Sequence, residues 1–469
     1  MFKTANKNYF FLISLFLFAF LIRSLVFCFY LGENRNYWQV DSNTYHKIAV
    51  SIDKGDGVTV DEKSNFYRLP GYSFFLSIYY KLFGVNTKNV LWVQIFLASF
   101  IPIFTFFLSL VLFPTNLLLA KVVGFYSSIH LGLVLYSGFF MTESLFILFF
   151  LLFSILFFSS FHFFFCHKKN QKNDFNLGAQ PCPDYMCSGP SFVELCNDIE
   201  TWQENKYKRF NLYKLFFAGI FLGISSLIRP VGHYLIFLSV LILFFSRDLW
   251  LDKIKKTTVV FCGWVLIVFG WLLRNWLLTG YIFFHTLPGG HFLYFSAARS
   301  AMYEQNCSYN QAKDFLRKKI SHLADQKVIT FKKKLNEPEY CNLRMNLAIK
   351  YFRKYPFITA KNWMTDILRT SLSLYSAELL YLENGRKEFD YFSNKRTVLG
   401  MFARYLFPKT KSTFLKLIVL CEILTLLCWS FYILCIPGFH GKTIVNVPFK
   451  FFTDKILMYP EVYIWISAL

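Results

Sequence analysis

The sequence of 469 residues lacks the signatures of the common nucleic-acid-binding and metal-binding modules. It has no zinc-finger or RRM motif, and its eleven cysteines include no CxxC pair, which argues against a zinc module and against a small disulfide framework. Four cysteines fall within one loop, where a metal site is the weaker alternative to unconnected thiols: Cys166, Cys182, Cys187 and Cys196. We predict no metal and no cofactor; a divalent cation is compatible with the sequence but not indicated by it.

Acidic residues are also few. The chain has 28 Asp and Glu against 50 Lys and Arg, and its formal net charge is +22. In a soluble protein this excess would suggest a nucleic-acid partner. Here many basic residues lie beside apolar runs, where they mark cytoplasmic loops and meet anionic lipid head groups, so we predict no nucleic-acid partner.

Short alternating strands, which a membrane barrel would need, are absent, and long apolar runs take their place. The chain is 55% hydrophobic, contains 60 Phe and has a mean hydropathy of +0.39. The apolar residues gather in runs of about 18 to 25 residues nearly free of charge, the length that a helix needs to cross a bilayer. Because only a helix satisfies its own backbone in lipid outside a closed barrel, the sequence predicts an all-α polytopic membrane protein.

The apolar runs predict about eight to ten membrane spans and no internal repeat. We expect spans at 9–31, 90–112, 117–136, 142–165, 215–228, 231–245, 259–278 and 414–436, with a poor candidate at 356–380. The last residues, 458–469, resemble the start of another span, which suggests that the sequence stops short of a natural C-terminus.

Basic loops set the orientation of these spans, because cytoplasmic loops carry an excess of Lys and Arg. The N-terminus and a long basic loop at 166–214 are predicted inside, and a first loop at 32–89 outside. Within that first loop, residues 70–84 begin with Pro and end with Gly, which predicts a short helix lying flat at the membrane surface. Residues 291–355 are predicted outside despite their lysines, because long loops translocate largely regardless of charge, and 356–469 form a C-terminal membrane region.

Six charged or titratable residues gather at the outer ends of the predicted spans: Asp41, Arg68, Glu143, Arg229, His233 and Arg274. Several arginines could hold phosphate oxygens there, and a carboxylate could take a proton from a hydroxyl group, a combination suited to a lipid-linked phosphate substrate. Structural explanations stay open for each residue. Arg23 and Arg274 could extend to the membrane surface, Arg229 could cap a helix end, and Asp41 could be the N-cap of the following helix.

The order of motifs resembles the bacterial branch of the GT-C glycosyltransferases, which includes protein O-mannosyltransferases and aminoarabinose transferases. A first span is followed by Asp41-Ser-Asn-Thr-Tyr45-His-Lys-Ile-Ala49, Tyr67-Arg-Leu-Pro-Gly-Tyr72, Lys81-Leu-Phe-Gly84, Thr142-Glu143, Gly219-Ile-Phe-Leu-Gly223, Leu227-Ile-Arg-Pro230 and Trp271-Leu-Leu-Arg-Asn275. The resemblance covers residues 1–290, which it implies are a GT-C-like transmembrane catalytic region with short juxtamembrane helices in the outer first loop. The polar loop 166–214 departs from the pattern as an insertion.

The resemblance implies an inverting transfer of a sugar from a polyprenyl-phosphate donor, in a bacterial inner membrane with the site facing the periplasm. It implies Asp41 as the general base, Arg68, Arg229 and Arg274 as ligands of the donor phosphate, and Tyr45 and Glu143 as orienting residues. The partners would be the lipid-linked donor, membrane lipid and an acceptor glycolipid, glycan or protein. The sequence leaves open which sugar and which acceptor.

Two other functions remain open. A transporter or flippase of lipid-linked sugars would also need many spans and basic residues, but it would place polar groups at mid-bilayer in broken helices. A membrane scaffold would not bring Asp41 and the arginines together.

Overall fold

The structure is a computed structural model that describes residues 8–32, 36–114, 116–160, 211–246, 249–331, 334–371, 375, 412–413 and 416–424. Its described part is almost entirely helical, with one short hairpin, so the predicted all-α class is confirmed. The chain divides into two compact units. The first comprises residues 1–57 and 70–270, and the second comprises 58–69 and 271–469. The second unit therefore takes one segment from the first loop, which a single division at residue 290 does not anticipate.

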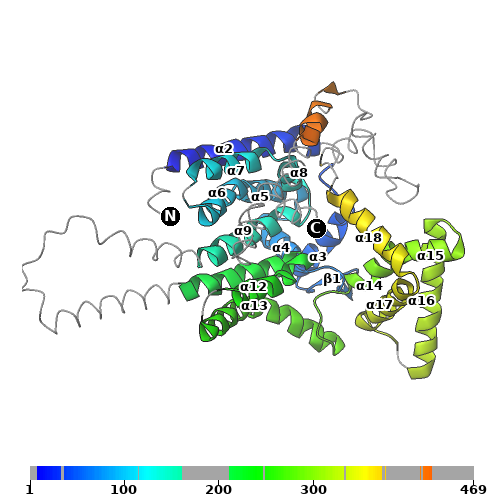
Figure 1. Ribbon diagram of the computed structural model, residues 1–469. Helices are drawn as coiled ribbons and strands as arrows, with labels where there is room; N and C mark the ends of the chain where they lie inside the picture. The colour runs from blue at the N-terminus through cyan, green and yellow to red at the C-terminus, as the bar shows by residue number, and fades with distance from the viewer. Residues whose placement is uncertain are drawn as a thin grey trace, which may run out of the picture. The chain divides into compact units, whose positions relative to one another are not determined.

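The first unit is a bundle of apolar helices with two short helices at one end (Figure 1). Its elements are α2 (Tyr9–Val26), the π-helical turn η1 (Phe27–Leu31), α3 (Ser42–Lys54), α4 (Gly71–Phe83), α5 (Thr87–Ala98), α6 (Ile101–Leu112), α7 (Leu117–Ile129), α8 (Leu131–Gly138), α9 (Glu143–Ser159), the helix Asn211–Ile228, the 3₁₀ turn η4 (Pro230–His233), α12 (Leu235–Phe244) and α13 (Trp250–Thr279) as far as Gly270.

Four helices in the described part are long and apolar enough to cross a membrane: Tyr9–Leu31, Thr87–Leu112, Asn211–Ile228 and Trp250–Thr279. The pair α7 and α8, bent by 47°, makes a fifth if it is one span. Two shorter apolar helices, Glu143–Ser159 and Pro230–Phe244, coincide with further predicted spans. The protein is thus membrane-embedded, and the total of eight to ten spans stays a prediction.

Glycines bring two of the spanning helices into close contact. A Cβ on Gly219 would lie 2.2 Å from the backbone oxygen of Val260, and one on Gly263 would lie 2.3 Å from that of Phe216. The indole nitrogen of Trp264 donates to Ser226 Oγ at 2.9 Å across the same contact. Small residues drive helix association in lipid because they let two backbones approach closely. The Gly219-Ile-Phe-Leu-Gly223 motif therefore packs helix Asn211–Ile228 against α13.

Arg23 lies inside the first span and is only 1% exposed. Its Nη1 donates to the carbonyl oxygen of Ala19 at 3.1 Å and to that of Ser128 at 3.3 Å. Ser128 stands at the end of α7, just before the bend to α8 at His130. Arg23 thus binds a carbonyl at a break in the neighbouring span. This contact replaces the extension to the membrane surface that was one interpretation of the sequence.

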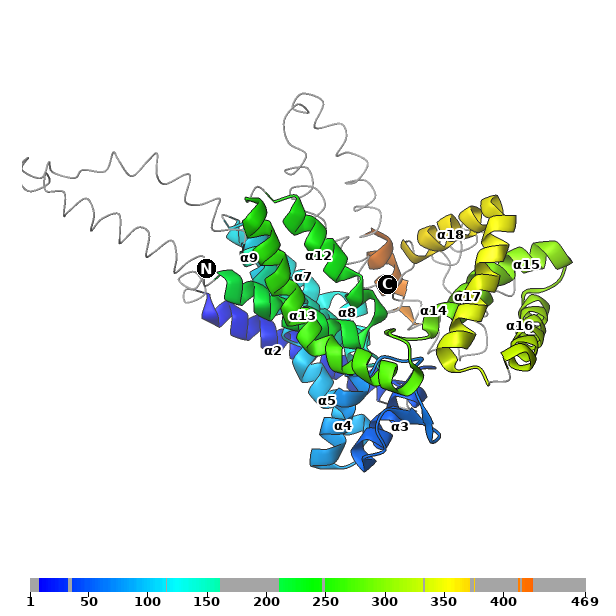
Figure 2. The ribbon, with the colours of Figure 1, turned by 90° about the horizontal axis from the view of Figure 1, so that it is seen from below.

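The two short helices α3 and α4 mark one end of the bundle in both views, beside the start of α5 (Figures 1 and 2). The start of α2, the end of α9 and the start of helix Asn211–Ile228 lie at the other end. The start of the first span and the two short helices of the first loop therefore lie at opposite ends of the first unit.

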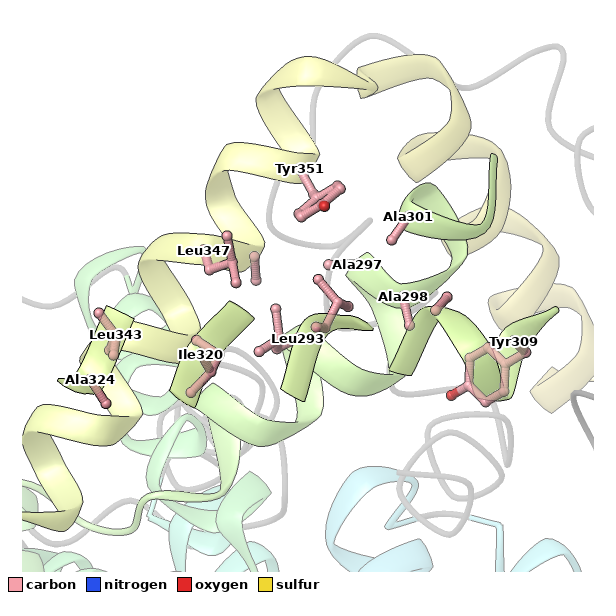
Figure 3. Close-up of a cluster of buried hydrophobic side chains, with 13 residues drawn as sticks. Leu293, Ala297, Ala298, Ala301, Tyr309, Ile320, Ala324, Leu343, Leu347 and Tyr351 are labelled. Atoms are coloured by element: carbon pink, nitrogen blue, oxygen red, sulfur yellow. The ribbon is translucent and has the colours of Figure 1, made fainter. Parts of the chain in front are cut away.

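The second unit contains the hairpin β1 (Thr59–Val60) and β2 (Lys63–Ser64), α14 (Leu287–His291), η5 (Phe292–Ala297), α15 (Ala298–Gln305), α16 (Tyr309–Phe331), α17 (Glu337–Lys354) and α18 (Pro356–Ser371). The strands are antiparallel, with Thr59 opposite Ser64. Figure 3 shows how Leu293, Ile320 and Leu347 point toward one another in a shared core. A capping box between Asn336 and Glu339 begins α17. Residues 287–371 therefore form a helical subdomain with its own apolar core.

The structure describes only part of each of two predicted spans near the C-terminus. The described part of 356–380 is α18, which carries Lys361 and Asp366 and is not among the helices long and apolar enough to cross a membrane. The predicted span 414–436 lies mostly outside the described residues, which include a helical stretch at 416–424. The loop 166–210, with its four cysteines, lies wholly outside them.

Candidate functional site

Asp41 immediately precedes α3, at the N-cap position, but its side chain makes no capping hydrogen bond. The helix instead begins with Ser42, whose Oγ accepts from the backbone N–H of Gln39 at 2.9 Å and donates to the carbonyl of Phe140 at 2.8 Å. Asp41 is half-buried. Its carboxylate is therefore not used as the helix cap that one reading of the sequence proposed.

Tyr45 and Ala49 lie on the same face of α3 as Asp41, and both are buried. The ring of Tyr45 packs edge-on against Tyr72 of α4, with 5.2 Å between centroids. The carbonyl of Tyr45 accepts from Ser73 Oγ at 3.1 Å. Tyr45 thus fixes α3 on α4, and it acts on the direction of Asp41 through the helix they share.

A buried amide holds α4 in turn. The Tyr72 hydroxyl donates to Gln94 Oε1 at 2.9 Å, and Gln94 Nε2 donates to the carbonyls of Ser137 and Phe139 at 3.0 and 2.8 Å. Burial raises the pKa of Tyr72 well above its usual value, and the nearby Tyr80 and Glu143 add to this rise. The phenol is therefore a permanent donor that links α4 to the segment preceding α9.

The end of helix Asn211–Ile228 meets the first residue of α4. A Cβ on Gly71 would lie 2.7 Å from the carbonyl oxygen of Leu227 and 2.9 Å from Ile228 Cγ1. Only glycine allows this approach without a shift of backbone. Because Arg229 follows directly, α4 packs beside the corner that carries this arginine.

Glu143 and Arg229 form an ion pair of 3.2 Å between Oε1 and Nη1, and both side chains are mostly buried. Thr142 Oγ1 donates to the other carboxylate oxygen at 3.4 Å. Glu143 is the first residue of α9, where the helix dipole favours a negative charge. The guanidinium also lies 6.0 Å from the ring centroid of Phe146. The Glu143 carboxylate therefore holds the guanidinium of Arg229 in place.

Asp41 and this ion pair are linked through one short segment. Phe140, whose carbonyl binds Ser42, donates its own N–H to the carbonyl of Tyr37 at 2.9 Å, and Glu143 follows three residues later. The first unit therefore brings together the segments that carry Asp41, Tyr45, Glu143 and Arg229.

Aromatic side chains near Asp41 were not predicted as site residues. Trp38 stacks on Phe140 with centroids 5.1 Å apart, and His46 lies edge-on to Trp38 at 5.7 Å. His46 Nδ1 is 2.9 Å from the Tyr80 hydroxyl, and burial followed by the nearby Tyr37 raises the pKa of Tyr80. Their closeness to Asp41 in the sequence could have indicated them, since Trp38 lies three residues before Asp41 and His46 five residues after it.

Arg274 belongs to the second unit and binds neutral acceptors. Its Nη1 donates to the carbonyl of Asn65 at 3.1 Å and to Asn275 Oδ1 at 2.9 Å, and its Nη2 donates to the carbonyl of Val58 at 3.0 Å. The guanidinium lies 4.9 and 4.8 Å from the ring centroids of Phe66 and Trp271. Arg274 thus fastens the 58–66 segment to α13, a structural use that the sequence did not predict.

Arg68 lies in the same unit and follows that segment. Its guanidinium is 4.9 Å from the ring centroid of Tyr67, and its carbonyl accepts from Asn65 Nδ2 at 2.9 Å. Burial lowers the pKa of His285 to about 4, and the positive charge of Arg68 contributes to this shift. His285 is therefore neutral near pH 7 and lies near Arg68.

His233, the histidine among the six predicted residues, is buried in η4 against the ring of Tyr234. Among the described residues, no group of three or more His, Cys, Asp or Glu could hold a metal ion. The predicted residues fall into two sets, with Arg68 and Arg274 in the second unit and the other four in the first.

Comparison with known proteins identifies no relative: no family model, no curated protein and no solved structure matches the chain.

Proposed function

We propose that the chain is a glycosyltransferase that moves a sugar from a polyprenyl-phosphate donor to a lipid, glycan or protein acceptor at the outer face of a bacterial inner membrane. The observation that carries this proposal is the connection between the segments that hold Asp41, Glu143 and Arg229. Asp41, which does not cap its own helix, stands on a segment hydrogen-bonded to the start of α9, where Glu143 holds Arg229. A carboxylate and an arginine carried by hydrogen-bonded segments of an apolar bundle suit chemistry on a lipid-linked phosphate. The order of motifs in residues 1–290 supports the same class.

In this mechanism Asp41 accepts the proton of the acceptor hydroxyl as its oxygen attacks the anomeric carbon. The bond from that carbon to the phosphate oxygen breaks, so the polyprenyl phosphate leaves with its electron pair and the configuration inverts. Arginine stabilises the growing negative charge on the phosphate. Of the three candidate arginines, Arg229 is the one whose ion pair with Glu143 lies on the segment that is hydrogen-bonded to the start of α3, next to Asp41. No metal enters any step.

Asp41→Asn tests the proposal directly. We expect the variant, purified in lipid, to lose transfer from a panel of polyprenyl-phosphate sugars by at least about 100-fold, the lower range for general-base catalysis. Asp56→Asn is the matched control, because Asp56 is an exposed carboxylate just after α3. Equal Tm values would show that folding is intact. Near-normal transfer by the Asp41→Asn variant would refute the assignment.

One observation favours the alternative, a transporter or flippase of lipid-linked sugars. The bend between α7 and α8 interrupts an apolar span, and the buried Arg23 binds a carbonyl at this break. Broken helices with polar groups in the membrane are typical of transporters. The two functions differ in vesicles. A transporter moves a fluorescent lipid-linked sugar across the bilayer unchanged, whereas a transferase releases polyprenyl phosphate in amounts equal to the glycosylated product.

A further inference from the structure

Helix α18 has its polar and apolar faces reversed relative to a helix of a soluble domain. Thr359, which is 5% exposed, faces the subdomain, and its hydroxyl is 3.4 Å from that of Ser300. On the same side, Arg299 of α15 pairs with Asp366 through both carboxylate oxygens, one at 3.0 Å. The inner contact of α18 therefore includes a hydroxyl pair and a bidentate ion pair.

The outer face of α18 is apolar. Phe357 is 88% exposed, Met364 59%, and Trp363 and Ile367 42% each. With Pro356 and Ala360, these residues occupy neighbouring directions around the helix, since successive residues turn by about 100°. We call this set the outer face of α18. A continuous apolar face of this size marks a surface that something else covers.

We propose that a lipid bilayer covers the outer face of α18, so that the helix lies flat in the lipid–water interface. The protein is membrane-embedded, so lipid is its constant surroundings. The described part of the helix has 16 residues, about 24 Å in length, and carries the charged residues Lys361 and Asp366. The ion pair of Asp366 with Arg299 also holds its inner side against the subdomain. Over its described length, the helix therefore suits a position along the membrane surface better than one across the hydrocarbon.

The residues of this helix match an interfacial position in composition and charge. Trp is enriched at membrane interfaces, and Trp363 packs on one side against Phe352, 5.4 Å between centroids, while the rest of its ring stays accessible. Lys361 borders the outer face and is exposed, and Arg353 and Lys354 are exposed at the end of α17 just before it. Basic side chains at this position attract anionic head groups.

Helix α4 of the first unit shows the same reversal independently. Ser73 and Tyr80 face inward and form hydrogen bonds, whereas Phe74, Ile78 and Leu82 are exposed. Exposed apolar residues opposite hydrogen-bonded polar ones are thus found in two helices, α4 and α18. It does not depend on the proposed enzymatic function.

A nitroxide spin label on the full-length protein in bilayers containing phosphatidylglycerol tests the proposal. In a background with native cysteines changed to serine, Phe357→Cys and Met364→Cys place labels on the outer face, and Lys319→Cys places one on the exposed side of α16. We expect labels at 357 and 364 to collide more with oxygen and less with a water-soluble nickel complex than the label at 319. Equal nickel accessibility would overturn the proposal, and so would shielding from both reagents, which would mean that protein covers this face.

A second measurement needs no change to the cysteines. Benzoylphenylalanine replaces Phe357 in the otherwise native chain, with the same substitution at Lys319 as the control. After irradiation we expect a phospholipid adduct at 357 and none at 319. Cross-linking at 357 to a second copy or another protein segment, without lipid adducts, would contradict a lipid-covered face.

Discussion

Arginines that resemble one another in sequence have different partners in the structure. Arg229 faces a carboxylate at 3.2 Å, whereas Arg274 donates to two backbone carbonyls and one side-chain amide. A guanidinium has five N–H donors in a planar fork, so it suits both uses. The contacts of Arg274 hold the 58–66 segment in place. Its observed role is therefore structural.

His285 makes the stability of the second unit depend on pH. The unfolded chain takes up a proton on this residue near pH 6.5, whereas the folded protein does so only near pH 4. Between these values the unfolded state binds more protons, so stability is full above pH 6.5 and decreases as the pH falls toward 4. We expect the Tm in detergent to fall more steeply over this range in the wild type than in His285→Asn.

The exposed His322 on α16 is the matched control, and His322→Asn should keep the wild-type pH dependence. Carboxylates that titrate in the same range affect all three proteins alike, so the difference between slopes isolates His285. Identical slopes for wild type and His285→Asn would show that this histidine is not protected from protonation.

Among the elements, the contact between helix Asn211–Ile228 and α13 depends on glycine. A Cβ at position 219 would lie 2.2 Å from a backbone oxygen, which cannot move aside as a side chain can. Overpacking of this kind costs about 1–3 kcal/mol. We expect Gly219→Ala to lower the Tm by several degrees, measured in the same detergent as the wild type. Gly270→Ala is the control, because a Cβ there meets nothing within 4 Å. Equal Tm values for the two variants would refute the close contact.

The sequence predicts the end of a helix correctly where a single residue type, such as glycine, sets that end. Gly84 ends α4 with φ of +80°, as its position after an amphipathic stretch predicts, and the long apolar runs at 9–31 and 259–278 are helical. The bend between α7 and α8 was missed because we interpreted the run 117–136 as one continuous span, although the polar His130 stands at the bend. The reversed polarity of α18 was also missed, since a helical pattern does not tell which face lies inside.

The candidate site could be predicted only in part, for a physical reason. Asp41 and Glu143 stand at helix starts, and such positions can be recognised locally from apolar runs that begin beside a charge. The partners of Arg274 cannot be recognised in this way, because its acceptors Asn65 and Val58 lie 209 and 216 residues away in the chain. Long-range hydrogen bonds to backbone carbonyls leave no trace in the acceptor's side chain. The ion pair of Glu143 with Arg229 was easier to anticipate because one motif carries a negative charge and the other a positive charge.

At the scale of the whole molecule, the orientation of the bundle decides whether the proposed reaction is possible. Asp56 follows α3 at the end that carries the candidate site, and Leu249 is exposed between α12 and α13 beside the basic residues at 253–256. The positive-inside rule predicts that these two positions lie on opposite sides of the membrane. We expect Asp56→Cys, with native cysteines changed to serine, to react with a membrane-impermeant maleimide in intact cells. Leu249→Cys should react only after permeabilisation. The reverse result would place Asp41 on the cytoplasmic side, out of reach of a donor in the outer leaflet, and would exclude the proposed reaction even if Asp41 were essential.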